Sequence, residues 1–285
     1  MTKQTNNNEW TTILKAQRHW WNINLKEIWA YKDLIALFVR RDFVAYYKQT
    51  ILGPLWFLIQ PLFTTVVFTV IFGKIANIPT NGVPPMLFYM SGIVCWNYFA
   101  ECLNKTSNTF VSNAGIFGKV YFPRMVTPIS VVISNLLTFL IQFSLFMCFW
   151  FYFMSKGSNI YISAYVWFLP LLILQMACLG LGIGIIISSL TTRYRDLTFA
   201  VGFGVQLWMY ATPVVYPLSE VHGKLRWIVL LNPMTPVIET FKNIFLGVGS
   251  ISSQMLVYSW LEVIVILLIG ILMFSKVEKN FMDTV

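Results

Sequence analysis

The chain contains six apolar blocks. They cover about residues 55–75, 86–104, 125–154, 160–190, 197–215 and 256–274, and polar or basic segments separate them. A helix needs about 20 apolar residues to cross the hydrocarbon core of a bilayer. Each block reaches or approaches that length, and the third and fourth exceed it, which predicts tilted helices or helices that extend beyond the membrane. The pattern therefore predicts an all-α integral membrane protein with six transmembrane helices.

A segment before the first block predicts a helix of another kind. Residues 22–39 place Leu25, Trp29 and Ile35 near helical spacing, with charged residues between them. This pattern is typical of an amphipathic helix that lies at a membrane interface, where Trp29 and Tyr31 would sit at headgroup depth. The alternative is an ordinary amphipathic helix packed on protein.

The segment between the fifth and sixth blocks, residues 216–250, is apolar but broken. Asn232-Pro233 and Pro236 divide it into pieces that are each too short to cross a bilayer. Non-spanning backbone is tolerated at membrane depth only where protein or a water-filled cavity covers it. We therefore expect two short re-entrant helices that form a gate on the outer face. The residues assigned to this outer gate are Trp227, Asn232, Pro233 and Glu239.

Composition and charge agree with a membrane protein and suggest its orientation. The chain is 57% hydrophobic and 11% charged, with a mean hydropathy of +0.68, whereas soluble domains carry about a quarter charged residues. With the N-terminus in the cytoplasm, most of the 20 lysines and arginines fall on the inner side, as the positive-inside rule requires. Both termini are then cytoplasmic, and the net charge of +9 needs no nucleic acid to explain it. The basic residues left on the outer side are Lys74, Lys156, Lys224, Arg226 and Lys242.

The sequence lacks the motifs that several chemistries require. Gly115 to Lys119 resembles part of a nucleotide-binding loop, but its spacing fails and Val120 stands where Ser or Thr is needed. The four cysteines form no C-x-x-C pair and lie away from both histidines, so no metal site or disulfide framework is expected. The acids in or near apolar blocks are isolated, which argues against an enzyme. Gly180 and Gly184 form a G-x-x-x-G pair, which predicts close packing of two helices.

Residues 40–63 carry the most specific chemistry. Three cations alternate with aromatic residues, the chain turns at Gly53-Pro54, and an apolar run follows directly. Arginine suits bidentate contacts to phosphate, so this stretch predicts a site where an anionic, bulky ligand meets the membrane edge. For any single cation, simple positive-inside anchoring explains its position equally well.

The inner loop between the second and third blocks predicts a docking surface. Residues 112–124 contain five large apolar residues, and Ser112 or Asn113 would cap a short helix that ends before Pro123. A contiguous exposed patch of this kind marks an interaction site. We expect it to bind a cytoplasmic partner, the alternative being a helix that packs back onto the membrane domain.

Several stretches, in order along the chain, resemble one family. They are Tyr47-Lys-Gln-Thr-Ile-Leu-Gly-Pro-Leu-Trp56 with Gln60-Pro61-Leu62, Lys119-Val-Tyr-Phe-Pro-Arg124, Arg195-Asp196, Thr212-Pro-Val-Val-Tyr-Pro217, Leu231-Asn-Pro-Met234 and Glu278-Lys-Asn-Phe-Met-Asp283. They resemble the membrane subunits of type-2 ATP-binding-cassette exporters, in the branch that exports polysaccharides and polyol phosphates. The chain departs from the family pattern at Lys242, where an Arg is common, which keeps the charge but loses bidentate geometry.

The resemblance implies a bacterial inner-membrane homodimer with two ATPase subunits bound on its cytoplasmic side. This chain would bind no cofactor, because ATP and Mg belong to the partner ATPase. The cargo would be a lipid-linked glycan, typically on undecaprenyl diphosphate, and O-antigen is the expected class. The helix at 22–33 resembles an interface helix, the 112–124 loop a coupling helix, and residues 220–247 the outer gate.

The same resemblance, together with residue type, assigns the site residues. The lipid-diphosphate group comprises Arg40, Arg41 and Lys48. Aromatics expected to line the glycan path are Tyr46, Tyr47, Trp56, Trp96, Tyr98, Trp208 and Tyr210. Residues expected to couple to the ATPase are Ile116, Phe117, Lys119, Tyr121, Phe122, Pro123 and Arg124.

The expected domain plan has three parts: a cytoplasmic N-terminal segment at 1–50, a transmembrane domain at 51–275 and a cytoplasmic tail at 276–285. Three alternatives remain open at this point. A capsule or teichoic acid exporter of the same family differs only in cargo. A membrane-embedded transferase acting on lipid-linked sugars would need clustered acids and bases. A channel or ion-coupled transporter would need no ATPase partner.

Overall fold

The computed structural model of the protein describes residues 25–48, 51–192, 194, 196–249 and 252–284, and these residues form helices and connecting segments without strands. Basic residues of the first 24 positions, together with Arg193 and Arg195, lie outside the described part. The long helical segments are η1 (Gly53–Leu55) with α3 (Trp56–Phe68) and η2 (Thr69–Ile75), α4 (Pro85–Ser107), α6 (Val126–Ser155), η3 (Ala164–Phe168) with α7 (Leu169–Thr191), α8 (Leu197–Tyr210) and α11 (Ser253–Thr284). The short elements are α1 (Leu25–Ala30), α2 (Lys32–Tyr47), α5 (Thr109–Phe117), η4 (Leu218–Glu220), α9 (Gly223–Leu230) and α10 (Met234–Leu246).

Each of the six apolar blocks corresponds to one of the long helical segments. Four of them are long and apolar enough to cross a membrane: Gly53–Ile75, Val126–Ser155, Ala164–Thr191 and Ser253–Glu278. The fifth block was predicted too long, because α8 ends at Tyr210 after 14 residues and the chain then turns. The 23-residue α4 carries Glu101 and Lys105 near its end. The described residues thus form a multi-pass membrane protein.

α4 lies at the centre of the fold, because it is buried along most of its length between α3, α6, α7 and α10. Its approach to α7 depends on glycine. A Cβ placed at Gly184 would lie 2.6 Å from Thr106 Cβ, and one at Gly180 would lie 2.7 Å from Cys102 Cβ. Any side chain at either position therefore collides with α4. This confirms the close packing predicted from the G-x-x-x-G pair.

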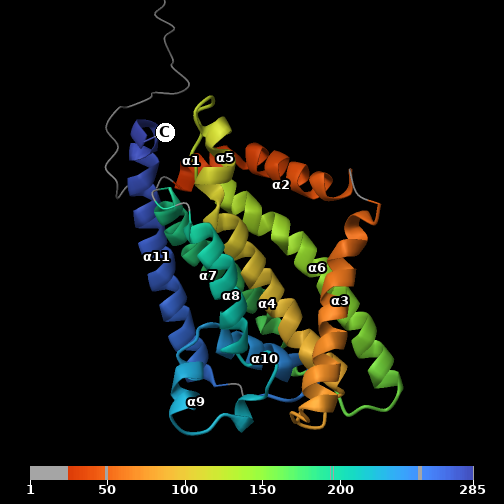
Figure 1. Ribbon diagram of the computed structural model, residues 1–285. Coiled ribbons are helices and arrows are strands. Elements are labelled where there is room, and N and C mark those ends of the chain that lie inside the picture. Colours follow the sequence, from red (N-terminus) through yellow and green to blue (C-terminus); the bar gives the residue numbers. More distant parts are fainter. Residues whose placement is uncertain (1–24, 49–50, 193, 195, 250–251, 285) are drawn as a thin grey trace, which may run out of the picture.

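The elements separate to two ends of the helical bundle (Figure 1). α1, α2, α5 and the C-terminal end of α11 gather at one end, where α2 runs across the ends of the long helices. α9 and α10 lie at the opposite end. Between α2 and the segment Gly53–Ile75 the chain turns at Gly53, whose φ of 48° is a left-handed conformation that favours glycine. Pro54 follows at the start of the helical segment. The predicted Gly-Pro turn is confirmed.

Candidate functional site

A cluster of phenylalanines holds α5 and the loop after it against its neighbours. The ring of Phe122 packs edge-on against Phe38 of α2, with 5.9 Å between ring centroids, and lies 5.7 Å from the ring of Phe117. Phe110 of α5 stacks on Phe274 of α11 at 4.6 Å. The α5 segment is therefore attached to both α2 and α11 through its buried face.

This packing divides the apolar residues that we expected to form one exposed docking surface. Phe117 and Phe122 are only 4% and 6% exposed and belong to the internal cluster. Val120 and Tyr121 are 59% and 62% exposed, and Ile116 also reaches the surface. Of the apolar residues in this loop, only these three are placed to contact a partner directly.

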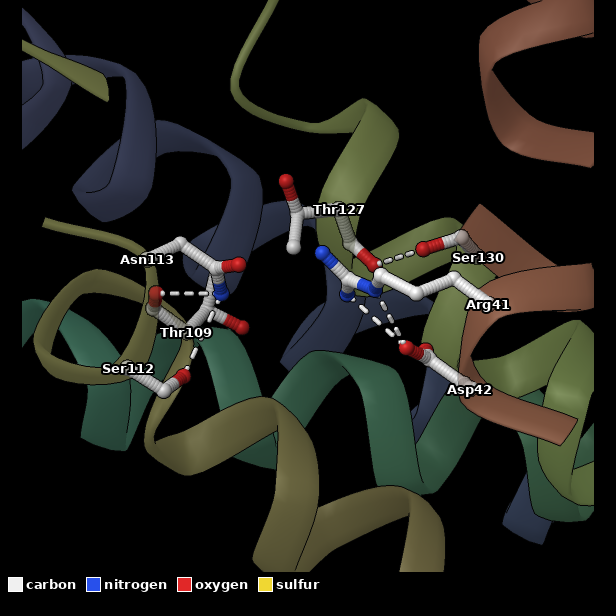
Figure 2. Close-up of polar contacts among 7 residues, drawn as sticks. All are labelled: Arg41, Asp42, Thr109, Ser112, Asn113, Thr127 and Ser130. Carbon is white, nitrogen blue, oxygen red and sulfur yellow. Dashed lines mark hydrogen bonds and ion pairs between the residues drawn. The ribbon is translucent and has the colours of Figure 1, made fainter. Parts of the chain in front are cut away.

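α5 begins earlier than predicted. It starts at Thr109, so Ser112 and Asn113 lie inside the helix and neither caps it. Ser112 Oγ donates to the carbonyl oxygen of Asn108 at 2.7 Å. Asn113 Nδ2 donates to the carbonyl oxygen of Thr109 at 3.0 Å (Figure 2). Each side chain bonds back to the carbonyl four residues before it, which explains how polar residues fit within this short helix.

Arg124 connects the α5 loop to the last helix. Its backbone N–H donates to the carboxylate of Glu278 at 3.0 Å, and its Nη1 donates to the Glu278 carbonyl oxygen at 2.8 Å. The guanidinium also lies over the Phe117 ring, 5.5 Å from the centroid. Burial lowers the pKa of Arg124, and the Glu278 carboxylate opposes that shift. By contrast, Lys119 is exposed and Pro123 is half-buried.

Arg124→Ala is expected to destabilise the attachment of the loop to α11. The change removes the charge-assisted bond from the guanidinium to Glu278 and its packing on Phe117, which costs about 2–3 kcal/mol of unfolding free energy. A thermal unfolding curve of the detergent-purified subunit measures the loss. Lys119→Ala, at an exposed neighbour, is the matched control and should leave the curve unchanged. An unchanged curve for Arg124→Ala would contradict the contact.

A cavity of about 670 Å³ opens between α2, α3, α4, α5 and α6. Four asparagines and five serines or threonines line it, with three charged and five apolar residues. Its polar lining residues are Asn104, Asn108, Asn113, Asn135, Thr109, Ser112, Thr127, Ser134 and Thr138. Figure 2 shows the Arg41–Asp42 pair of α2 on one side of Thr127 and the side chains of Ser112 and Asn113 on the other. We call this the inner cavity.

The cations that reach the inner cavity each have a carboxylate neighbour. Arg41 Nη2 lies 2.8 Å from Asp42 Oδ1, and its guanidinium covers the Phe38 ring at 4.7 Å from the centroid. Lys105 Nζ lies 2.8 Å from Glu101 Oε2 and donates to Asn135 Oδ1 at 2.9 Å. We did not assign Lys105 to the site from sequence. The sequence nevertheless contained a sign of this polar site, because the polar residues 101, 104, 105 and 108 recur on one side of a helix at the end of an otherwise apolar block.

The other predicted phosphate contacts lie on the surface. Arg40 and Lys48 are exposed on and just after α2. Of the three cations, Arg41 alone lines the inner cavity. The side chains of Tyr46 and Tyr47 lie outside the described part of the structure.

The predicted path aromatics do not form one surface within the subunit. Trp96 is buried and packs edge-on against Trp208, with 6.1 Å between ring centroids. Tyr98 is buried on another side of α4, against Phe139 at 5.2 Å. The remaining two, Trp56 and Tyr210, are exposed on α3 and α8.

The predicted outer gate consists of two unlike helices. α9 is exposed, with Trp227 73% accessible, whereas nearly all of α10 is buried. Of the two predicted breaks, Asn232-Pro233 lies between the helices and Pro236 does not interrupt them. Pro236 lies in the first turn of α10, where its missing N–H costs no helical bond. Asn232 Nδ2 donates to Thr212 Oγ1 at 2.7 Å, and Pro233 O accepts a bond from Ser259 at 2.8 Å.

Lys242 of α10, which we placed on the outer side of the membrane from sequence, is a buried charge. It is 1% exposed, its Nζ donates to the Pro213 carbonyl oxygen at 2.6 Å, and it lies 3.8 Å from the centroid of the Phe88 ring. Glu239, one turn earlier, is buried as well. Lys242 and Glu239 line a cavity of about 270 Å³ together with Arg226 of α9. Lys242 thus ties α10 to the chain that follows α8.

These features define the chain as a multi-pass membrane protein. It belongs to the ABC-2 type transporter family, which matches residues 33–246. The chain is similar to two O-antigen export system permease proteins RfbA from Klebsiella pneumoniae, at 27% and 26% identity over 251 residues, covering 88% of this chain and 94% of each relative. An O-antigen export system permease protein RfbA from Myxococcus xanthus is 27% identical over 224 residues, covering 78% of this chain and 83% of the relative.

Proposed function

We propose that the chain is the membrane subunit of an ATP-driven exporter that moves an O-antigen-like, lipid-linked polysaccharide across the bacterial inner membrane. The observation that carries this proposal is the similarity over nearly the whole length of the named O-antigen permeases. The arrangement at the α2/α5 end supports it, since the loop after α5 presents Val120 and Tyr121 to solvent while α5 itself is attached to its neighbours through its buried face.

In the proposed arrangement six helices cross the membrane: the segment 53–75, α4, α6, the segment 164–191, α8 and α11. α4 crosses inside the protein, where neighbouring helices cover its polar residues. Both termini then face the cytoplasm, with α2 at the inner interface. Two copies of the chain and two copies of a separate ATPase make the complete exporter, and the ATPase binds ATP and Mg.

Coupling follows from the attachment of α5. When the ATPase binds ATP and moves the exposed tip at Val120 and Tyr121, the buried phenylalanines transmit that displacement to α2 and α11. Arg124 carries it to the end of α11 through Glu278. At the opposite end, α10 is held by Lys242 and its neighbours, so α9 is the part of the outer gate that is free to move.

Arg40→Ala combined with Lys48→Ala is expected to weaken the use of lipid-diphosphate substrate. Arg40 is exposed in the middle of α2 and Lys48 directly after the helix. Losing a charge-assisted bond to phosphate raises the apparent substrate constant about tenfold. The matched control is Lys26→Ala with Lys32→Ala, which removes two exposed cations from the start of the same region. If both pairs weaken export equally, positive-inside anchoring explains the cations and the phosphate role is wrong.

The overall function is tested by deleting the gene and staining for surface polysaccharide. The deletion strain is expected to lose the surface glycan and to accumulate lipid-linked glycan in the inner membrane, and a plasmid copy should restore it. Purified with an affinity tag, the chain should carry an ATPase subunit. An intact surface glycan in the deletion strain would contradict the proposed export role.

A further inference from the structure

The inner cavity combines amide and hydroxyl side chains with an apolar surface, a lining that suits an uncharged ligand with both hydroxyls and apolar faces. Its amide and hydroxyl side chains outnumber its charged ones, and they come from α4, α5 and α6. Amides and hydroxyls both donate and accept hydrogen bonds, which matches a ligand whose own hydroxyls do the same. The volume of about 670 Å³ lies within the range of roughly 300–1,000 Å³ that small-molecule sites occupy.

The charges around the cavity balance one another, which argues against an anionic ligand. Arg41 is paired with Asp42, and Lys105 is paired with Glu101. A phosphate entering the cavity would have to compete with a carboxylate for each cation. An uncharged ligand faces no such competition.

Three lining residues retain unused hydrogen-bonding capacity. Asn104 Oδ1, Thr127 Oγ1 and Ser134 Oγ are buried oxygens with no hydrogen-bond partner among the described residues. Thr127 as a whole is only 2% exposed. Leaving buried polar atoms unpaired is unfavourable, so the cavity wall holds hydrogen-bonding groups that a small side-chain rotation would turn toward a polar ligand.

The apolar part of the lining fits the same class of ligand. Phe43 of α2 and Phe57 of α3 contribute aromatic rings to the cavity wall. Sugars combine hydroxyls with C–H faces that pack on aromatic rings, so a mixed lining of amides, hydroxyls and rings is suited to them.

We propose that the inner cavity binds neutral sugar units. This inference rests on the proposed function: the sugar units belong to the exported glycan and enter after its lipid head. α5 supplies Ser112, Asn113 and Ile116 to the wall. A bound sugar therefore touches the helix that leads directly into the exposed loop with Val120 and Tyr121, so occupancy of the cavity reaches the ATPase through α5 and that loop.

The test is saturation-transfer NMR on the permease–ATPase complex in lipid nanodiscs. The neutral probes are chitobiose, lactose and maltose, and inorganic diphosphate is the anionic probe. At least one neutral sugar should receive saturation from the protein. Ser134→Leu fills the cavity from α6 and should reduce that signal about fivefold or more, because the hydroxyl and its space are both lost. Ser134→Ala, which keeps the fold, should reduce it by a smaller factor.

The matched control is Ser144→Leu, on an exposed face of the same helix, which should leave the sugar signal unchanged. Three results overturn the proposal: no neutral sugar receives saturation, both Ser134 variants bind sugar like the unmodified protein, or diphosphate alone binds in a manner that Ser134→Leu abolishes. The export role is judged separately by the deletion strain. If the deletion strain loses its surface glycan but no sugar binds the complex, only the cavity proposal is rejected. If sugar binds but the deletion strain keeps its surface glycan, only the export role is rejected.

Discussion

Gly184→Leu is expected to prevent the membrane domain from folding. The added side chain would begin 2.6 Å from Thr106 Cβ, inside the contact between α7 and the central α4. Because that neighbour is a Cβ close to the backbone, the two helices must separate, which costs about 3 kcal/mol or more. Leucine is apolar, so membrane insertion is unaffected and the result reports on packing alone.

The measurement is the yield and thermal stability of the subunit purified in mild detergent. Gly202→Leu provides the control, because Gly202 lies on the exposed α8 and a Cβ there meets nothing within 4 Å. We expect the Gly202 variant to purify normally and the Gly184 variant to aggregate. Equal stability of the two variants would show that α4 and α7 do not approach as described.

Val120→Asp combined with Tyr121→Asp is expected to abolish binding of the ATPase subunit. Both side chains are exposed at the tip of the α5 loop and make no part of the buried phenylalanine cluster. Burying two carboxylates in place of apolar anchors costs about 4 kcal/mol, or roughly a thousandfold in Kd. Phe122→Asp is unsuitable for this purpose, because Phe122 packs on Phe38 and its loss would also release α5 from α2.

Co-purification with a tagged ATPase subunit measures this effect. The matched control is Leu225→Asp with Trp227→Asp, two exposed apolar residues of α9 at the opposite end of the bundle. Only the α5 pair should lose the partner while the subunit stays folded. If the α5 pair co-purifies with the ATPase at the level of the control, the partner binds elsewhere.

The hydrophobic pattern predicted the fold well because it depends on long, strongly apolar segments. Every block produced a helix, and the glycine pair predicted a close helix contact. The end of α8 was placed too late, because the apolar run continues past Tyr210 to Val215. The start of α5 was misplaced because Ser112 and Asn113 bond to carbonyls within the helix, an arrangement that sequence alone does not separate from capping.

Side-chain direction was what the sequence could not supply. Phe122 and Tyr121 are adjacent apolar residues, yet one is buried and the other exposed, since neighbouring residues point to different sides. The sequence counted Lys242 on the outer side of the membrane but gave no sign that it is buried against Phe88, where Pro213 offers it a carbonyl oxygen. The inner cavity was also missed, because its lining comes from helices far apart in the chain.

The central claim is that this chain, powered by an ATPase attached through α5, exports a lipid-linked glycan. The most direct measurement is ATP-dependent movement of lipid-linked glycan across liposomes that contain the purified permease and its ATPase. The account predicts glycan accessible on the far side only when ATP is supplied, with no such movement for the Val120→Asp/Tyr121→Asp permease. Movement without ATP, or undiminished movement by that variant, would contradict it.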